Sequence, residues 1–246
     1  MNGVEQLASW IQESSNIVFF GGAGTSTESG IPDFRSAAGL YQTEQHSPYP
    51  PEELLSRHFF DQHADIFYDF YRGKMLHPDA EPNGCHRLLA RLEQEGRLKA
   101  VITQNIDGLH QKAGSTNVLE LHGSVHRNAC MDCGRFYPLN DIIRSKDAVP
   151  RCAACHGVIK PDVVLYEEEL DQNTLYQSVD AISSADLLLV GGTSLTVHPA
   201  AQLITYFRGK HTVLLNATPT AYDRQADLLI TEPIGEVMIK VDQLLG

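Results

Sequence analysis

The sequence lacks any apolar run long enough to span a bilayer. Its first five residues also lack the basic start and long apolar stretch of a signal peptide. Basic residues are few, with 19 lysines and arginines against 31 acidic residues and a net charge of −12. Because no local Lys/Arg cluster offsets this charge, direct binding to nucleic-acid phosphates is disfavoured. We therefore expect a cytoplasmic protein without a membrane or nucleic-acid partner.

Internal repeats and low-complexity tracts are also absent. What is present is 246 residues with 42% apolar content, enough to bury a full core. Amphipathic helical patterns at 4–12 and 85–95 alternate with short apolar runs, which are typical of buried parallel strands. These runs lie at 17–20, 100–103, 118–121, 185–190 and 212–215. The alternation predicts an α/β protein with a parallel sheet and crossover helices.

Two stretches interrupt this alternation. Residues 36–79 are rich in aromatics, proline and histidine, and residues 125–158 contain four cysteines. We interpret both as insertions that leave the sheet and form a smaller lobe. The sheet domain then comprises the remaining residues, namely 1–35, 80–124 and 159–246.

Cysteine is scarce, but four of the five cysteines follow the spacing Cys130-x2-Cys133-x18-Cys152-x2-Cys155. Two CxxC pairs at this separation are typical of a tetrathiolate zinc site. Disulfides are the alternative, and a reducing cytoplasm disfavours them. Four thiolates leave no open position on the metal, so the predicted zinc is structural. Cys85 lies in a helical pattern and is expected to be a small core residue.

A glycine-rich segment, GGAGTSTESGIPDFR at 21–35, follows the first predicted strand. Such glycines let the backbone approach a phosphate at a helix N-terminus. The segment is not a standard dinucleotide fingerprint, because Thr27 occupies the third glycine position. No second strand ending in an acidic residue follows about 20 residues later. A hydride-transfer dehydrogenase is therefore disfavoured.

Polar side chains follow two further predicted strands. Gln104, Asn105 and Asp107 come directly after the strand at 100–103, and His122 follows the run at 118–121. Asparagine and aspartate commonly cap a helix or form a turn. Alternatively, ligands of open α/β sheets bind in the crevice outside the carboxyl ends of the strands. Both interpretations remain open from the residues alone.

Taken together, these motifs resemble the sirtuin family of NAD-dependent protein deacylases. The resemblance rests on GAGTS (22–26), SGIPDFR (29–35), TQNID (103–107), LHG (121–123), the two CxxC pairs and GTS (192–194), which occur in family order. It implies a Rossmann-like parallel-sheet domain, a small inserted lobe made of a helical module and a zinc-ribbon-like module, and a cleft between them. It also implies protein-lysine deacetylation that consumes NAD and yields nicotinamide, O-acyl-ADP-ribose and free lysine.

The resemblance assigns most polar loop residues to NAD. The pyrophosphate would lie along the glycine loop, Asp107 would accept from the nicotinamide carboxamide, and Thr193, Ser194 and Asn216 would hold the adenosine half. Ser194 or Thr196 could instead cap a helix expected at 200–207, and Asn216 could be a strand-end turn residue. The implied NAD-binding residues are Ala23, Gly24, Ser26, Thr27, Phe34, Arg35, Gln104, Ile106, Asp107, Thr193, Ser194, Asn216 and Ile234.

For catalysis the resemblance implies that His122 deprotonates a ribose hydroxyl after the acyl oxygen has displaced nicotinamide. Asn105 would order a water or ribose group near the bond that breaks. The acyl-lysine peptide would add as a strand along residues 163–166. The implied peptide contacts are Val163, Val164, Leu165, Tyr166 and Val197.

Two departures from the family pattern bear on the substrate. Glu167 stands where the family usually has glycine, and an added acid there would favour basic substrate sequences. Family members that remove acidic acyl groups carry Tyr-x-x-Arg in the helical insertion, whereas Tyr71 is followed here by Lys74 at the final position. Neutral acyl groups, acetyl first, are therefore expected.

Two other function classes are compatible with the same motifs. One is a protein mono-ADP-ribosyltransferase, and the other is a non-catalytic NAD-sensing protein. The presence of Asn105, Asp107 and His122 together favours the deacetylase over both.

Overall fold

The computed structural model describes residues 2–36, 39–43 and 48–246. Part of the predicted helical insertion, residues 37–38 and 44–47, lies outside these ranges. Across the described ranges, every helix is too short or too polar to cross a membrane.

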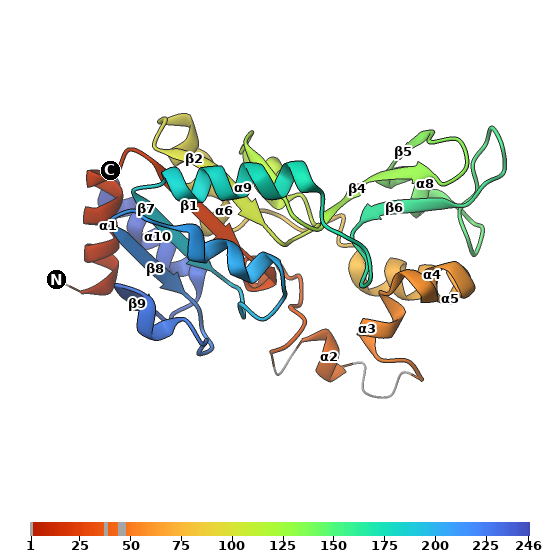
Figure 1. The fold of residues 1–246 in the computed structure, drawn as a ribbon, viewed down its shortest axis with the longest axis horizontal. Helices are drawn as coiled ribbons and strands as arrows, with labels where there is room; N and C mark the ends of the chain where they lie inside the picture. The colour runs from red at the N-terminus through yellow and green to blue at the C-terminus, as the bar shows by residue number, and fades with distance from the viewer. Residues whose placement is uncertain (1, 37–38, 44–47) are drawn as a thin grey trace.

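A six-stranded parallel sheet forms the larger part of the molecule, with strand order β3-β2-β1-β7-β8-β9 (Figure 1). The strands are β1 (Ile17–Gly21), β2 (Leu98–Thr103), β3 (Val118–Glu120), β7 (Leu187–Gly191), β8 (His211–Leu215) and β9 (Leu228–Ile230). Phe19 of β1 lies opposite Val101 on one side and Leu189 on the other. All residues of β1 and β7 are buried, as expected for parallel strands covered on both faces.

Helices cover both faces of this sheet. α1 (Gly3–Glu13), α6 (Gly84–Gln94) and α10 (Ile234–Leu245) pack on one face, and α9 (Gln172–Ser184) and the 3-10 helix η4 (Ala200–Tyr206) pack on the other. Phe19 belongs to the first core and Phe20 to the second, because successive strand residues point to opposite faces. This arrangement confirms the predicted Rossmann-like α/β fold. The remaining elements of this part are η1 (Ala23–Thr25), η2 (Thr27–Ser29), α7 (Leu109–Ala113) and η5 (Asp223–Gln225).

Two segments far apart in the sequence build a smaller lobe, at the right of Figure 1. One is an antiparallel sheet of order β5-β4-β6 with one helix: β4 (Gly123–Cys130), β5 (Phe136–Pro138), α8 (Leu139–Arg144) and β6 (Ile159–Val163). The other is helical: α2 (Leu40–Thr43), α3 (Pro51–Leu54), α4 (Arg57–Gln62), α5 (Ala64–Phe70) and the π-helix η3 (Tyr71–Met75). Strand β6 pairs with β4, so this sheet extends beyond residue 158.

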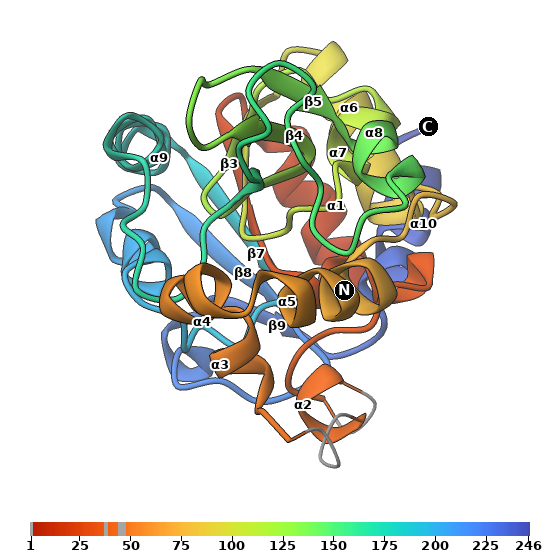
Figure 2. The same cartoon turned by 90° about the vertical axis from the view of Figure 1, so that its right-hand side faces the viewer.

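The two segments share one hydrophobic core. Phe67 and Tyr68 of α5 belong to the same buried cluster as Val125 and Ile142. The Tyr68 hydroxyl also donates to the Ile159 carbonyl at 2.5 Å. Figure 2, which looks onto this lobe, shows α4 and α5 below strands β4 and β5. The predicted small inserted lobe is therefore confirmed as a single packed unit.

Candidate active site

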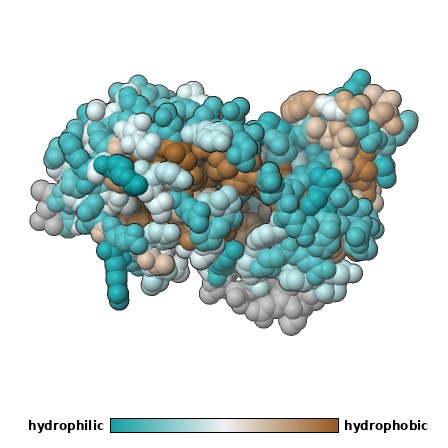
Figure 3. All heavy atoms as spheres, viewed as in Figure 1, coloured by the Kyte–Doolittle hydropathy of each residue, from teal (hydrophilic) through white to brown (hydrophobic). Residues whose placement is uncertain are grey.

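A cavity of about 1090 Å³ lies between the carboxyl edge of the parallel sheet and the small lobe. Figure 3 shows apolar surface near the middle of the molecule, between the two lobes. The cavity brings together every site residue predicted from the sequence apart from the four cysteines: Ala23, Gly24, Ser26, Thr27, Phe34, Arg35, Gln104, Asn105, Ile106, Asp107, His122, Val163, Val164, Leu165, Tyr166, Thr193, Ser194, Val197, Asn216 and Ile234.

The glycine loop after β1 packs closely against the loop after β7. A Cβ added to Gly24 would lie 2.8 Å from the Cα of Gly192, and the Gly24 amide donates to the Gly192 carbonyl at 2.8 Å. Two short 3-10 helices, η1 and η2, follow the loop. The close approach of Gly192 therefore leaves no room for a side chain at position 24. The sequence alone does not indicate this reason for the glycine.

Asp107 joins this loop to the segment after β2. The Ser26 hydroxyl donates to Asp107 Oδ2 at 2.7 Å, and Asn105 Nδ2 donates to the Ser26 oxygen at 3.0 Å. The other carboxylate oxygen accepts from the Leu109 amide at 2.9 Å, next to the start of α7. Asp107 therefore both supports the following helix and lines the cavity, so the two interpretations of this aspartate are compatible.

A second polar cluster lies where β7 and β8 end. Gln104 Nε2 donates to the Thr193 hydroxyl at 3.0 Å. Asn216 is buried, and its side chain accepts from the Thr193 amide at 3.0 Å and donates to the Thr193 carbonyl at 2.8 Å. Asn216 thus fixes the loop that carries Ser194. Helix η4 begins after Pro199 without a side-chain cap, so the capping alternative for Ser194 is wrong.

The Gln104 carbonyl determines which ring nitrogen of His122 carries a proton in the neutral form. Its Nδ1 lies 3.0 Å from the Gln104 carbonyl oxygen, which can only accept, so Nδ1 carries a proton and the neutral ring has its free lone pair on Nε2. Burial lowers the pKa of His122, and the bond to the Gln104 carbonyl opposes this shift only in part. A neutral imidazole in a cavity wall is suited to act as a general base.

The segment expected to receive a peptide is already paired along part of its backbone. The Val164 amide donates to the His122 carbonyl at 3.0 Å. Tyr166 donates from its amide to the Leu55 carbonyl and accepts from the Arg57 amide, at 2.9 and 3.0 Å. The backbone donor and acceptor of Tyr166 are therefore both in use, so it meets the cavity mainly through its side chain.

The four cysteines of the two CxxC pairs gather in the small lobe, away from the cavity lining. Their sulfurs all lie within 4.8 Å of one another, with Cys130 to Cys155 at 3.4 Å and Cys133 to Cys152 at 3.6 Å. Tetrahedral zinc with Zn–S bonds of about 2.3 Å separates its sulfurs by roughly 3.8 Å, whereas a disulfide needs about 2.05 Å. The cluster therefore fits a structural zinc ion. Cys85, by contrast, is fully buried in the core, as expected.

Comparison with known proteins agrees with this geometry. Residues 22–199 match the family model described as Sir2 family. The chain belongs to the Sir2 family, the sirtuins. It is 56% identical to an NAD-dependent protein deacetylase of Clostridium acetobutylicum over 97% of both chains. It is 53% identical to the protein of the same name in Clostridium tetani over the full length of both.

Solved sirtuin structures match over almost the whole chain. A Sir2 structure with a p53 peptide and NAD+ has a TM-score of 0.87 and 38% identity, covering 99% of this chain and 98% of that one. A Sir2 structure with a deacetylated p53 peptide and 3'-O-acetyl ADP ribose has a TM-score of 0.90 and 36% identity, with the same coverage.

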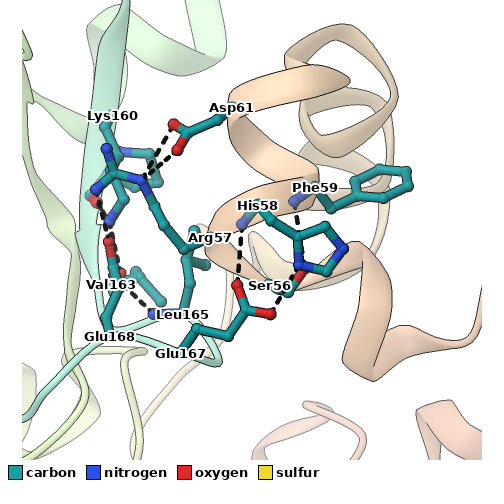
Figure 4. A network of polar contacts seen from close by, with 11 residues as sticks. Ser56, Arg57, His58, Phe59, Asp61, Lys160, Val163, Leu165, Glu167 and Glu168 are labelled. Atoms are coloured by element: carbon teal, nitrogen blue, oxygen red, sulfur yellow. Dashed lines mark hydrogen bonds and ion pairs between the residues drawn. The ribbon is translucent and has the colours of Figure 1, made fainter.

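In this sirtuin the residue that replaces the family's glycine sits in a tight turn. The Glu168 amide donates to the Leu165 carbonyl at 3.0 Å, and Glu167 has φ of 78°, as the third residue of a type II turn requires. The Glu167 carboxylate contacts His58 of α4, accepting from its amide at 3.1 Å and meeting its Nδ1 at 2.8 Å (Figure 4). Since this carboxylate is already engaged, it gives less reason to expect a preference for basic substrates.

Sequence reasoning missed the role of Glu168. Its carboxylate meets Arg57 Nη1 at 3.0 Å, Lys160 Nζ at 3.1 Å and the Leu165 amide at 2.9 Å (Figure 4). Burial raises its pKa, but the Leu165 amide and the two cations lower it by more, so the net shift is downward. A run of three glutamates usually indicates a solvated surface, and no local signal separates the middle one.

Tyr71 and Lys74, which stand at the positions compared with the Tyr-x-x-Arg pattern, differ in their relation to the cavity. Tyr71 is fully buried in the small-lobe core and is absent from the cavity lining, whereas Lys74 lines the cavity. Tyr71 cannot therefore contact an acyl group without repacking that core.

Proposed function

We propose that the protein is an NAD-dependent protein-lysine deacetylase that releases nicotinamide, O-acyl-ADP-ribose and free lysine. The observation that carries this proposal is the contact of His122 Nδ1 with the Gln104 carbonyl, which leaves Nε2 as the nitrogen that can accept a proton in the neutral ring. A base of this kind can accept a proton from a ribose hydroxyl at neutral pH. Its place in one cavity with the glycine loop and the 163–166 segment supports the use of two substrates.

NAD is proposed to lie along the carboxyl edge of the sheet as co-substrate. Arg35, on the loop after β1, would pair with a phosphate as a charge-assisted donor. Asp107 would accept from the nicotinamide carboxamide, and Gln104 would meet ribose hydroxyls. Thr193, Ser194, Asn216 and Ile234 would surround the adenosine half at the ends of β7 and β8 and the start of α10.

The acyl-lysine is proposed to enter between the lobes. Ile106, Val163 and Leu165 provide apolar walls that would exclude water from the reacting atoms. Asn105, which is buried and held by Ser26, would orient a water or ribose group near the bond that breaks. Breaking a glycosidic bond in this way depends more on positioning than on a protein nucleophile. The residues present therefore suffice for the proposed reaction.

We also propose a cytoplasmic location and the division of the chain given by the sequence, with 36–79 and 125–158 forming the small lobe and strands β4 and β6 extending its sheet to residues 123 and 163. Free cysteines spaced for a metal ion rather than for disulfides support a reducing compartment.

The test incubates the protein with an acetyl-lysine peptide and NAD and follows peptide mass, nicotinamide and O-acetyl-ADP-ribose. We expect the three products in equal amounts. A peptide that instead gains the mass of ADP-ribose would establish a mono-ADP-ribosyltransferase. His122→Ala should abolish turnover while NAD still binds. His211→Ala serves as the matched control, because His211 stacks on Trp10 at the start of β8, away from the cavity.

A further inference from the structure

Two phenol hydroxyls meet at the cavity from opposite sides. Tyr41 OH and Tyr166 OH lie 2.8 Å apart, and both side chains line the cavity. Tyr41 lies in α2, shortly after the residues proposed to contact NAD, and Tyr166 belongs to the segment proposed to contact the peptide. The pair therefore joins the two proposed substrate walls.

On the NAD side, Tyr41 is attached to both neighbouring site residues. Its amide donates to the Phe34 carbonyl at 2.9 Å, and its ring meets the Phe34 ring edge-on with centroids 5.8 Å apart. The Arg35 guanidinium lies 5.2 Å from the Tyr41 ring centroid, within cation–π range. A change in the position of Phe34 or Arg35 must therefore move the Tyr41 hydroxyl.

On the peptide side, Tyr166 is held in place by the end of α3 and the start of α4. Its backbone pairs with Leu55 and Arg57, and the turn that follows it is fixed to α4 through Glu167 and Glu168 (Figure 4). The Tyr166 hydroxyl is therefore a fixed point for the Tyr41 hydroxyl. Burial and the bond to Tyr166 raise the pKa of Tyr41, so its proton is retained.

We propose that the Tyr41–Tyr166 hydroxyl pair couples the binding of NAD to the binding of the acyl-lysine peptide. The inference rests on the proposed function, since it requires both ligands in this cavity. A ligand that orders one wall then prepares the other through the pair, and the coupling must be the same in both directions. Both tyrosines act here as positioning residues and take no part in proton transfer.

The experiment measures equilibrium binding of carba-NAD, whose glycosidic bond cannot break, with and without a saturating acetyl-lysine peptide. The proteins are wild type, Tyr41→Phe, Tyr166→Phe and the double variant. Phenylalanine keeps the ring contacts and removes only the hydroxyl. Tyr206→Phe is the matched control, because this exposed tyrosine of η4 does not line the cavity.

In wild type and Tyr206→Phe we expect the peptide to tighten carba-NAD binding. The coupling factor is the ratio of the carba-NAD Kd without peptide to the Kd with peptide. In each single variant this factor should fall by about three- to tenfold, as loss of one hydrogen bond predicts. The double variant should fall no further, since both substitutions remove the same contact. A merely structural role would instead change unfolding stability and leave the factor unaltered.

Two results separate the possible failures. If wild type binds neither ligand, the proposed function is wrong. In the other case wild type binds both ligands and shows a coupling factor of one, or the factor stays unchanged in both single variants or falls additively in the double variant. Any of these three results would show that the coupling role is wrong while the proposed function stands.

Discussion

Replacing Glu168 should destabilise the protein far more than replacing Lys160, although the two side chains pair with each other. Their exposed fractions are 19% and 15%, and their contact is 3.1 Å. Burial lowers the pKa of Lys160, with Glu168 opposing the shift, so the ammonium is costly to keep charged here. Glu168→Ala would leave that ammonium with the Val163 and Pro161 carbonyls as its remaining partners.

The two substitutions should differ in their cost because only Glu168→Ala leaves a buried charge without its ionic partner. Breaking a fully buried pair costs about 3–5 kcal/mol, and the residual exposure of this pair reduces the expected cost of Glu168→Ala to about 2–3 kcal/mol. For a chain of this size that corresponds to a fall in Tm of roughly 4–12 °C. Lys160→Met should cost only about 0–1 kcal/mol. The reason is that Glu168 keeps Arg57 and the Leu165 amide, while the cost of burying the ammonium disappears.

The measurement is urea unfolding followed by circular dichroism, with Glu169→Ala, a change at the exposed neighbouring carboxylate, as the control. The pKa of Glu168 is lowered in the folded protein, so its contribution is complete above the ordinary glutamate value of about 4.3. It is lost as pH falls through that value towards the lowered one, so wild type and Glu168→Ala should converge in acid. If Lys160→Met proved as damaging as Glu168→Ala, the assigned roles would be wrong.

Three further predictions concern the site and the metal. Because burial lowers the pKa of His122, the acid limb of the rate profile should lie below the ordinary histidine value of about 6.5, and a limb at or above it would contradict the neutral base. Cys130→Ser should lose zinc by metal analysis and unfold at lower denaturant, since the metal's binding energy is folding energy, whereas Cys85→Ala should keep its zinc. Asp107→Asn should weaken nicotinamide inhibition by roughly tenfold or more, because an uncharged acceptor replaces a charged one, and zinc content should not change.

The main sheet and the grouping of the site residues could be predicted from the sequence. Consecutive apolar residues such as those of β1 and β7 indicate parallel strands buried on both faces. The carboxyl ends of such strands meet at one edge, so the loops carrying Asp107 and Thr193 had to converge. The roles of the individual residues in NAD and peptide binding stay predictions.

Contacts between segments distant in the sequence could not be predicted in this way. Gly24 was interpreted through phosphate binding, whereas its close approach to Gly192 depends on how two loops pack. The backbone pairing of Tyr166 depends on a segment more than a hundred residues away, around Ser56. Neither leaves a local pattern of spacing or composition.

At Glu167, a contact with a distant segment accompanies a backbone conformation that is unfavourable for a residue other than glycine. A φ of 78° disfavours any residue with a Cβ, and glycine is the usual solution in a type II turn. Here the side chain reaches His58 at the start of α4, and the next carboxylate reaches Arg57 on the same helix. Two consecutive contacts fix the turn to α4, so the turn and α4 should move as one body. Relative motion between the proposed substrate walls is then left to the NAD side, where Tyr41 meets Tyr166.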